Sequence, residues 1–238
     1  MIDHLLCVGA GGTGSILAPL AARYLAYRSA DPATFAVHIL DGDSFDATNA
    51  NRQPCNANPG THLPKALALR NLLRSQGLDP IEATVDFLSA RNASTYICGS
   101  AVSILAVDNH ASRRLSLLAF EQLLDETPRN TDALWISPGN STGLNVDAIH
   151  GTVLWWGRVN GQFVGMNPIH AVPNIAKPDA PPPVLGSCAN HAHSEPQLLV
   201  ANSMAASWTL AVLALVLEEK LPPTMSSLDW DLTSHTFS

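Results

Sequence analysis

The stretch that decides the fold is residues 5–14, LLCVGAGGTG, in which a short apolar run passes into a glycine-rich turn. Residues 5–9 have the pattern of a buried strand that ends in glycine. Apolar residues then recur at helical spacing, at Ile16, Leu17, Leu20, Tyr24 and Leu25. Pro19 is expected in the first turns of this helix, where the missing N–H of a proline costs least. A strand, a glycine turn and a helix are therefore predicted in that order.

Four glycines of this turn are candidate phosphate-binding residues: Gly9, Gly11, Gly12 and Gly14. Glycines between a strand and a helix let backbone N–H groups approach a phosphate closely, and the helix N-terminus favours its negative charge. The pattern alone is weak evidence, because domains that bind NAD or FAD share it.

Strands and helices alternate along the first 137 residues. Further strands are expected at 35–40, 101–107 and 133–137, with helices that begin at Pro64, as the first helical residue, and over 115–124. This alternation predicts an α/β fold with a Rossmann-like, mostly parallel, doubly wound sheet.

The pattern changes in the C-terminal part of the chain. Residues 148–156 and 162–164 are expected to form antiparallel strands, proline-rich residues 168–183 a long loop, and Leu228, Trp230 and Leu232 a closing strand. No internal repeat or second domain is evident, so residues 1–238 are predicted to form a single domain.

Composition excludes several classes of protein. The 238 residues are 46% hydrophobic and 14% charged, which is typical of a globular chain, and the net charge of −7 argues against a nucleic-acid partner. The four cysteines form no CxxC pair, so a zinc ribbon is not expected. The N-terminus lacks the basic-then-apolar order of a signal peptide. A reduced, cytoplasmic protein is the expectation.

Residues 198–217 form an uncharged stretch that is long enough to cross a bilayer. The stretch contains polar residues, among them Asn202 and Thr209, and Glu218 and Glu219 follow it directly. A buried core helix is therefore predicted, and no membrane association.

The stretch after the second strand separates the possible nucleotides. Asp41 ends that strand, where a carboxylate can accept hydrogen bonds from ribose hydroxyls of either a dinucleotide or ATP. Residues 41–53, DGDSFDATNANRQ, resemble the D-x-D-x-V-x-x-S-N-L-N-R-Q signature of the ThiF/MoeB/ubiquitin-activating superfamily. Lys65 follows Arg52 by thirteen residues, like that family's lysine at a helix start, and residues 106–109, AVDN, resemble its "TDN" element. These elements cover roughly residues 5–110 in the family's order.

The resemblance implies an ATP-dependent adenylyltransferase that activates the C-terminal carboxylate of a small ubiquitin-like (β-grasp) partner. It assigns nucleotide binding to Gly9, Gly11, Gly12, Gly14, Asp41, Asp43, Asn49, Arg52 and Lys65. Arg52 would offer a planar fork to phosphate oxygens and Lys65 a point charge. Asp108 would be a catalytic residue and a ligand of Mg2+ beside the leaving group. Asp43 has an alternative role in shaping its loop.

The sequence departs from the family at two places. Only residues 1–4 precede the first strand, so the arginine with which many relatives reach the ATP of a partner protomer has no match, and the zinc-binding CxxC pairs are absent. Residues 11–19, GGTGSILAP, and the segment from Ser187-Cys188 into a helix with Gln197 and Asn202 look like the ThiF-type proteins of PRTRC systems.

Cys188 is the candidate for a catalytic thiol. It lies near the position where relatives carry a thioester or persulfide cysteine, and a nearby histidine could lower its pKa. Two alternatives stay open: an inert loop thiol, and a metal ligand together with His191 and His193.

Two other functions compete with adenylation. An NAD-dependent oxidoreductase would have no use for Arg52 and Lys65, and a non-catalytic nucleotide-binding module would bind ATP without releasing pyrophosphate. A symmetric homodimer, as in ThiF and MoeB, is expected, because the long apolar helix and Trp155 and Trp156 offer more apolar surface than one sheet face needs.

Overall fold

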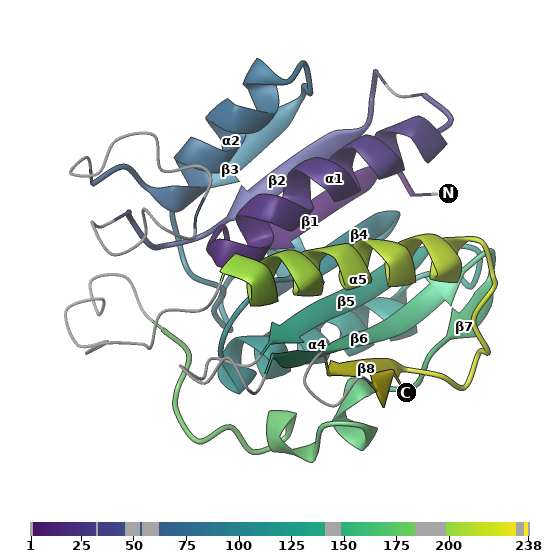
Figure 1. Cartoon of the computed structure of the whole chain (residues 1–238). Helices are drawn as coiled ribbons and strands as arrows, with labels where there is room; N and C mark the ends of the chain where they lie inside the picture. Colours follow the sequence, from purple (N-terminus) through teal and green to yellow (C-terminus); the bar gives the residue numbers. More distant parts are fainter. Residues whose placement is uncertain are drawn as a thin grey trace.

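The computed structural model describes residues 2–31, 33–45, 53, 62–140, 149–183, 199–231 and, for the backbone, 236–237. In this part of the chain nine strands form one sheet, in the order β3-β2-β1-β4-β5-β6-β8-β9, with β7 paired to β6 (Figure 1). The parallel strands are β1 (His4–Val8), β2 (Ala36–Leu40), β3 (Ile81–Thr84), β4 (Ala101–Leu105) and β5 (Ala133–Asn140). The antiparallel strands are β6 (His150–Val159), β7 (Gln162–Val164), β8 (Ser227–Asp231) and β9 (Thr236–Phe237). The predicted α/β class is confirmed.

Five α-helices are described: α1 (Gly12–Arg28), α2 (Lys65–Ser75), α3 (Ala93–Tyr96), α4 (His110–Glu126) and α5 (Leu199–Leu217). The 168–183 segment contains two 3-10 turns, η2 (Pro168–His170) and η3 (Pro173–Ile175). Helices α1, α2 and α5 contribute to the hydrophobic core on one face of the sheet, and α3 and α4 to the core on the other face. Helices α1 and α5 lie side by side (Figure 1).

The register of the central strands places the candidate site. Leu5 of β1 pairs with Val37 of β2 and with Val102 of β4, all in parallel. The amide of Gly9 donates to the carbonyl of Leu40 at 2.9 Å, just where these strands end. Since parallel strands end at a common edge, the residues that follow β1, β2 and β4 meet there.

Two details of the helix predictions are wrong. Pro19 lies inside α1, which begins at Gly12, so it is the eighth residue of the helix and lies beyond the first turns in which it was expected. Pro64 is the N-cap of α2, and Lys65 is the first helical residue.

Strand β3 and the short α3 were not predicted. β3 has four residues and α3 a single turn, and each has only one fully buried residue, so neither carries a clear period of apolar side chains. Leu232, expected in the closing strand, lies outside the described residues.

The two tryptophans of β6 are core residues. Trp155 is fully buried in the core beneath α1 and α5, and Trp156 packs edge-on against Phe120 of α4 at 5.8 Å between ring centroids. Adjacent residues of a strand point to opposite faces, so each tryptophan fills a different layer. They give no support to the predicted dimer.

Helix α5 is the one described helix that is long and apolar enough to cross a membrane. It packs on α1, β5 and β6, and Ala205, Ala206 and Leu213 are fully buried there. The packing is that of a core helix, as predicted.

Candidate functional site

In the turn after β1, backbone segments lie so close together that two positions have no room for a side chain. Gly9 has a φ of +94°, and a Cβ there would lie 2.9 Å from the carbonyl carbon of Ala106. A Cβ on Gly14 would lie 2.9 Å from the carbonyl carbon of Gly9. Side chains are therefore excluded at both positions, and the turn draws the start of α1 against the ends of β1 and β4.

The N-terminus of α1 is open to a ligand. Gly11 is the N-cap, no side chain caps the helix, and no acidic residue lies in its first turn. The first N–H groups of a helix have no intrahelical partners and carry a partial positive charge. Gly11 and Gly12 lie at this helix N-terminus, and their binding of an anion stays a prediction.

Asp41 follows β2 and lies against this turn. Its carboxylate accepts hydrogen bonds from the amide of Ala10 at 2.5 Å and from the amide of Asp43 at 2.7 Å. Burial raises the pKa of Asp41 to about 6, although Lys65 and the N–H of Ala10 act in the opposite direction. The carboxylate is 8% exposed and keeps lone pairs for further donors, so it can accept hydrogen bonds from ribose hydroxyls.

Lys65 and Asp43 form an ion pair beside Asp41. The Lys65 ammonium lies 3.1 Å from Asp43 Oδ2, and the Lys65 side chain is only 12% exposed. The amide of Lys65 also donates to the carbonyl of Asp43 at 2.8 Å. Asp43 therefore does shape its loop, and it also holds the Lys65 cation close enough to Asp41 to oppose the rise in that residue's pKa.

Asp108 is exposed at the end of β4, where the "TDN"-like element was expected. Asn109 donates to Asp108 Oδ1 at 3.3 Å, and it caps α4 by accepting a hydrogen bond from the amide of Ser112 at 2.7 Å. Among the described residues, no three His, Cys, Asp or Glu side chains could hold a metal by themselves. A single carboxylate suffices for Mg2+ when substrate phosphates and waters complete its shell.

Arg113 fixes the position of this β4–α4 connection. Its guanidinium donates to Ser137 Oγ at 3.1 Å and to the carbonyls of Val107 at 2.7 Å and Pro138 at 3.1 Å. Burial lowers the pKa of Arg113, and the nearby Asp108 carboxylate raises it. Nη1 also lies 3.5 Å from Nδ1 of His110. Arg113 therefore joins the β4–α4 connection to β5 and supports the site from below the surface.

The side-chain amides of Gln53 and Asn202, which come from other parts of the chain, lie next to the glycine turn after β1. A Cβ on Gly11 would lie 3.9 Å from Nε2 of Gln53, which is 6% exposed, and one on Gly12 would lie 2.7 Å from Cγ of Asn202. Within the described part of the chain, the buried atoms Gln53 Oε1 and Asn202 Nδ2 have no hydrogen-bond partner. Only Asn202 Nδ2 is a donor, as an anionic phosphate oxygen requires, whereas Gln53 Oε1 is an acceptor.

Three predicted site residues, Asn49, Arg52 and Cys188, lie outside the described residues, as do His191 and His193. Their roles stay predictions. The structure brings together the other predicted residues: the glycines, Asp41, Asp43 and Lys65, with Asp108 at the end of the adjacent strand β4.

Sequence reasoning gave no site role to Gln53, Arg113, Asn140 or Asn202. Gln53 is the last residue of the family-like signature at residues 41–53, and Asn202 is a polar residue in a mostly apolar helix. Both features could have indicated a role in the site. Arg113 and Asn140 carried none, since a charged helix residue and an asparagine after a strand are both common at the surface.

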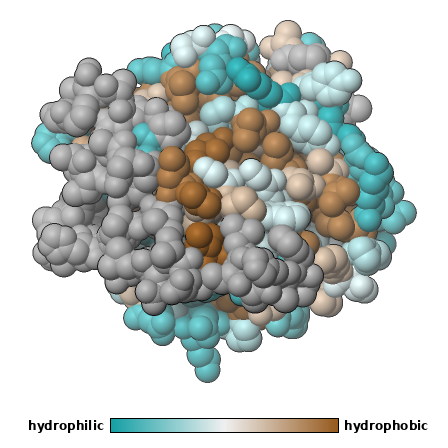
Figure 2. Space-filling model, in the orientation of Figure 1, coloured by the Kyte–Doolittle hydropathy of each residue, from teal (hydrophilic) through white to brown (hydrophobic). Residues whose placement is uncertain are grey.

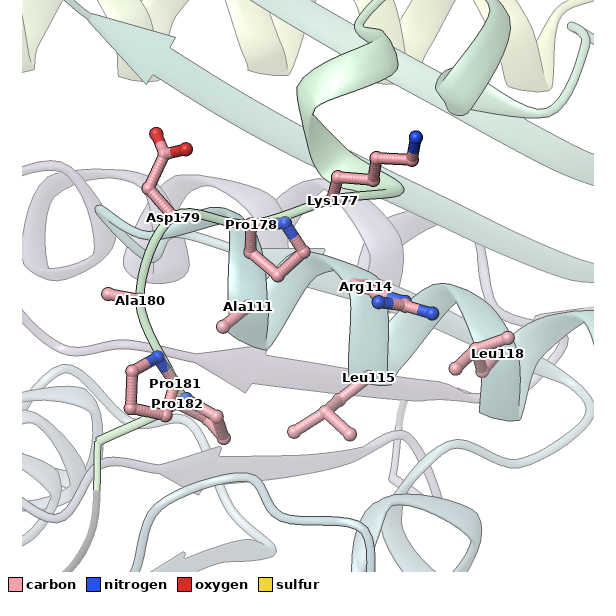
Figure 3. A pocket seen from close by; sticks show the side chains of 10 residues that line it. All are labelled: Ala111, Arg114, Leu115, Leu118, Lys177, Pro178, Asp179, Ala180, Pro181 and Pro182. Carbon is pink, nitrogen blue, oxygen red and sulfur yellow. The ribbon is translucent and has the colours of Figure 1, made fainter.

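A separate groove of about 550 Å³ lies on the outer side of α4 (Figure 3). Leu115 and Leu118 of α4 form one wall and residues 177–182 the other, with Arg114 and Lys177 at its rim. The groove is on the α4 face of the sheet and contains none of the predicted nucleotide-binding residues.

A parallel sheet with a glycine turn after β1, an uncapped helix N-terminus, and an acidic residue after β2 defines a Rossmann-like nucleotide-binding domain. The sequence matches the ThiF family over residues 3–235, so this chain belongs to the ThiF family. Among curated proteins no sequence matches it closely enough to indicate a relative.

Solved structures agree in fold. PaaA superposes with a TM-score of 0.64 at 15% identity, over 99% of this chain and 62% of PaaA. E. coli MccB with AMPCPP and MccA superposes with a TM-score of 0.59 at 11% identity, and E. coli MccB with ATP at 0.57 and 11%. Each MccB comparison covers 99% of this chain and 62% of the MccB chain, so this chain spans about three-fifths of the length of these neighbours.

Proposed function

We propose that this chain uses ATP to adenylate a carboxylate of a substrate. The observation that supports it most is the pairing of Lys65 with Asp43 directly beside Asp41. A dinucleotide oxidoreductase needs the ribose-binding carboxylate but no cation held next to it. An enzyme that removes pyrophosphate from ATP needs that cation, because negative charge builds up on the leaving phosphates.

The site residues that the structure describes have separate roles in this proposal. Asp41 accepts hydrogen bonds from the ribose hydroxyls, the first N–H groups of α1 face the phosphates, and Lys65 stabilises the negative charge of the phosphates. Arg52, predicted to bind phosphate beside Lys65, completes the cationic side. The MccB structure with ATP lends support, since that protein shares the fold.

The step itself is a displacement at phosphorus. An oxygen of the substrate carboxylate attacks the α-phosphorus, the acyl-adenylate bond forms, and pyrophosphate leaves with the electron pair of the broken P–O bond. No proton has to move, so the protein contributes mainly alignment and charge stabilisation. Asp108 would hold Mg2+, which supplies positive charge at the leaving group.

The acceptor proposed here is the C-terminal carboxylate of a small ubiquitin-like protein, as the resemblance to the ubiquitin-activating superfamily implies. A neighbour of this fold, E. coli MccB, has been solved together with AMPCPP and MccA. After adenylation, the Cys188 thiolate would attack the acyl carbon of the adenylate, form a thioester and release AMP. A reduced, cytoplasmic location suits such a thiol, and both cysteines of the described part, Cys7 and Cys98, are free.

The direct test is calorimetry with ATP·Mg2+ and with NADH, followed by ATP–pyrophosphate exchange with candidate small proteins encoded nearby. We expect ATP to bind and NADH not to bind, and exchange to appear only with the correct acceptor. NADH binding without ATP binding would overturn the assignment. ATP binding without exchange for any acceptor would favour the non-catalytic module.

In the same exchange assay, Cys188→Ala should keep ATP–pyrophosphate exchange and lose any thiol-sensitive covalent adduct with the partner protein.

We also propose a homodimer that buries the outer faces of α1 and α5. Figure 2 shows apolar surface over the α1–α5 side of the molecule, where Tyr27 is 87%, Val200 53% and Leu215 38% exposed. We expect light scattering at tens of micromolar protein to give a dimer mass, and Leu215→Glu to shift it toward a monomer. The matched control is Leu118→Glu, which changes an exposed leucine on α4. A monomer mass for the wild type would contradict the proposal.

A further inference from the structure

Asn202 ties three distant parts of the chain together at the glycine turn. It lies in the first turns of α5 and is fully buried. Its Oδ1 accepts a hydrogen bond from Thr13 Oγ1 of α1 at 3.1 Å and one from Asn140 Nδ2, at the end of β5, at 2.7 Å. The acceptor side of this amide is therefore occupied by protein groups.

The donor side of the Asn202 amide is different. Asn202 Nδ2 is buried and has no hydrogen-bond partner among the residues that the structure describes. It faces Gly12, where a side chain would collide with the amide. Nearly all buried donors in proteins are paired, because an unsatisfied one is unfavourable. The structural ties of Asn202 use only Oδ1, so they do not explain why the amide nitrogen is kept in this place.

The location of this donor indicates the chemistry of its partner. Gly12 is the first residue of α1, a 17-residue helix without a side-chain cap, and such an N-terminus favours an anionic oxygen. The Asn202 amide nitrogen lies against this same residue, so it adds another donor of the kind from which phosphate oxygens accept.

We propose that Asn202 Nδ2 donates a hydrogen bond to a phosphate oxygen of the bound nucleotide, so that α5 adds a side-chain donor to the phosphate site at the glycine turn. The inference rests on the proposed function for the nature of the ligand. It adds a binding residue that comes from the far end of the chain, 189 residues from Thr13.

The test is Asn202→Asp, which keeps an oxygen to accept from Thr13 and Asn140 and replaces the N–H donor by an anionic oxygen. Calorimetry would compare ATP with adenosine, which has no phosphate. We expect the ATP affinity to fall by at least about tenfold and the adenosine affinity to stay within about twofold, since only the phosphates meet the altered atom. The control Thr13→Val removes a hydrogen bond on the acceptor side and should leave both affinities within about threefold of wild type.

Equal ATP affinity in wild type and Asn202→Asp would overturn the inference, and so would equal losses for ATP and adenosine, which indicate a structural role. If thermal unfolding shows that Asn202→Asp does not fold, Asn202→Ala carries the same comparison without a buried charge. The test of Asn202 can be distinguished from the test of the proposed function. A wild type that binds ATP through Asn202 but never exchanges pyrophosphate would support the role of Asn202 and contradict the proposed adenylation.

Discussion

Asp108→Asn is expected to reduce ATP–pyrophosphate exchange by on the order of 100-fold while it leaves ATP affinity within a few-fold of wild type. The asparagine keeps the shape of the side chain and loses the charge that would hold Mg2+. That charge matters most when pyrophosphate departs, so the loss should appear in the rate and not in ground-state binding. Asp108 is exposed, and Arg113, not Asp108, makes the buried hydrogen bonds that hold the β4–α4 connection, so the fold should survive.

The matched control is Asp125→Asn, an exposed carboxylate at the other end of α4. Fifteen residues separate it from the start of that helix, or about 22 Å at the helical rise, so exchange should be unchanged. Exchange should also need more Mg2+ in Asp108→Asn than in wild type. A variant that exchanges at the wild-type rate and at the same Mg2+ concentration would remove Asp108 from the mechanism.

Asp41→Ala is expected to weaken nucleotide binding by at least ~1 kcal/mol, the scale of a lost hydrogen bond to a charged group. Adenosine is the better probe for this residue, because it presents the ribose without the phosphates that also titrate near neutral pH. Calorimetry at pH 7.5 would give the loss directly. An adenosine affinity equal to wild type would remove Asp41 from the ribose site.

The raised pKa of Asp41 predicts a pH dependence. Ribose hydroxyls donate to the ionised carboxylate, so binding favours the deprotonated form, and adenosine affinity should fall as the pH drops through about 6. At pH 5 the wild type should bind about tenfold more weakly than at pH 7.5. Asp41→Ala should bind equally weakly at both. A wild-type profile as flat as that of the variant would contradict the prediction.

The stability of the ligand-free protein should follow the opposite trend. The folded-state pKa of Asp41, about 6, lies above its ordinary value of 3.8, so the folded state binds more protons than the unfolded state between these values. The contribution of Asp41 to the free energy of unfolding is therefore greatest below about pH 4 and declines as the pH rises to 6, by up to about 3 kcal/mol. Urea unfolding of wild type and Asp41→Ala across this range would isolate it.

The sequence by itself determined the framework of this protein. The apolar run at residues 5–9, the glycines after it and Asp41 at the end of the second strand are local patterns. Each can be interpreted from neighbouring residues alone, because each reflects the backbone conformation at its own position. Glycine at position 9 follows from a positive φ, and the alternation of strands and helices leads to a parallel sheet whose ends share one edge. The ThiF resemblance added the roles of residues spaced along that edge.

Only the tertiary structure decided which polar groups meet there. Asp43 and Lys65 are 22 residues apart, and nothing in their sequence spacing requires the ion pair that places the cation beside Asp41. Asn202 reaches Thr13 and Asn140 because α5 packs against α1 and β5, and its amide nitrogen has no hydrogen-bond partner in the described part of the chain. Contacts of this kind depend on how helices cross a sheet, and the apolar period that predicts a helix does not specify which of its polar residues will be buried against a neighbour.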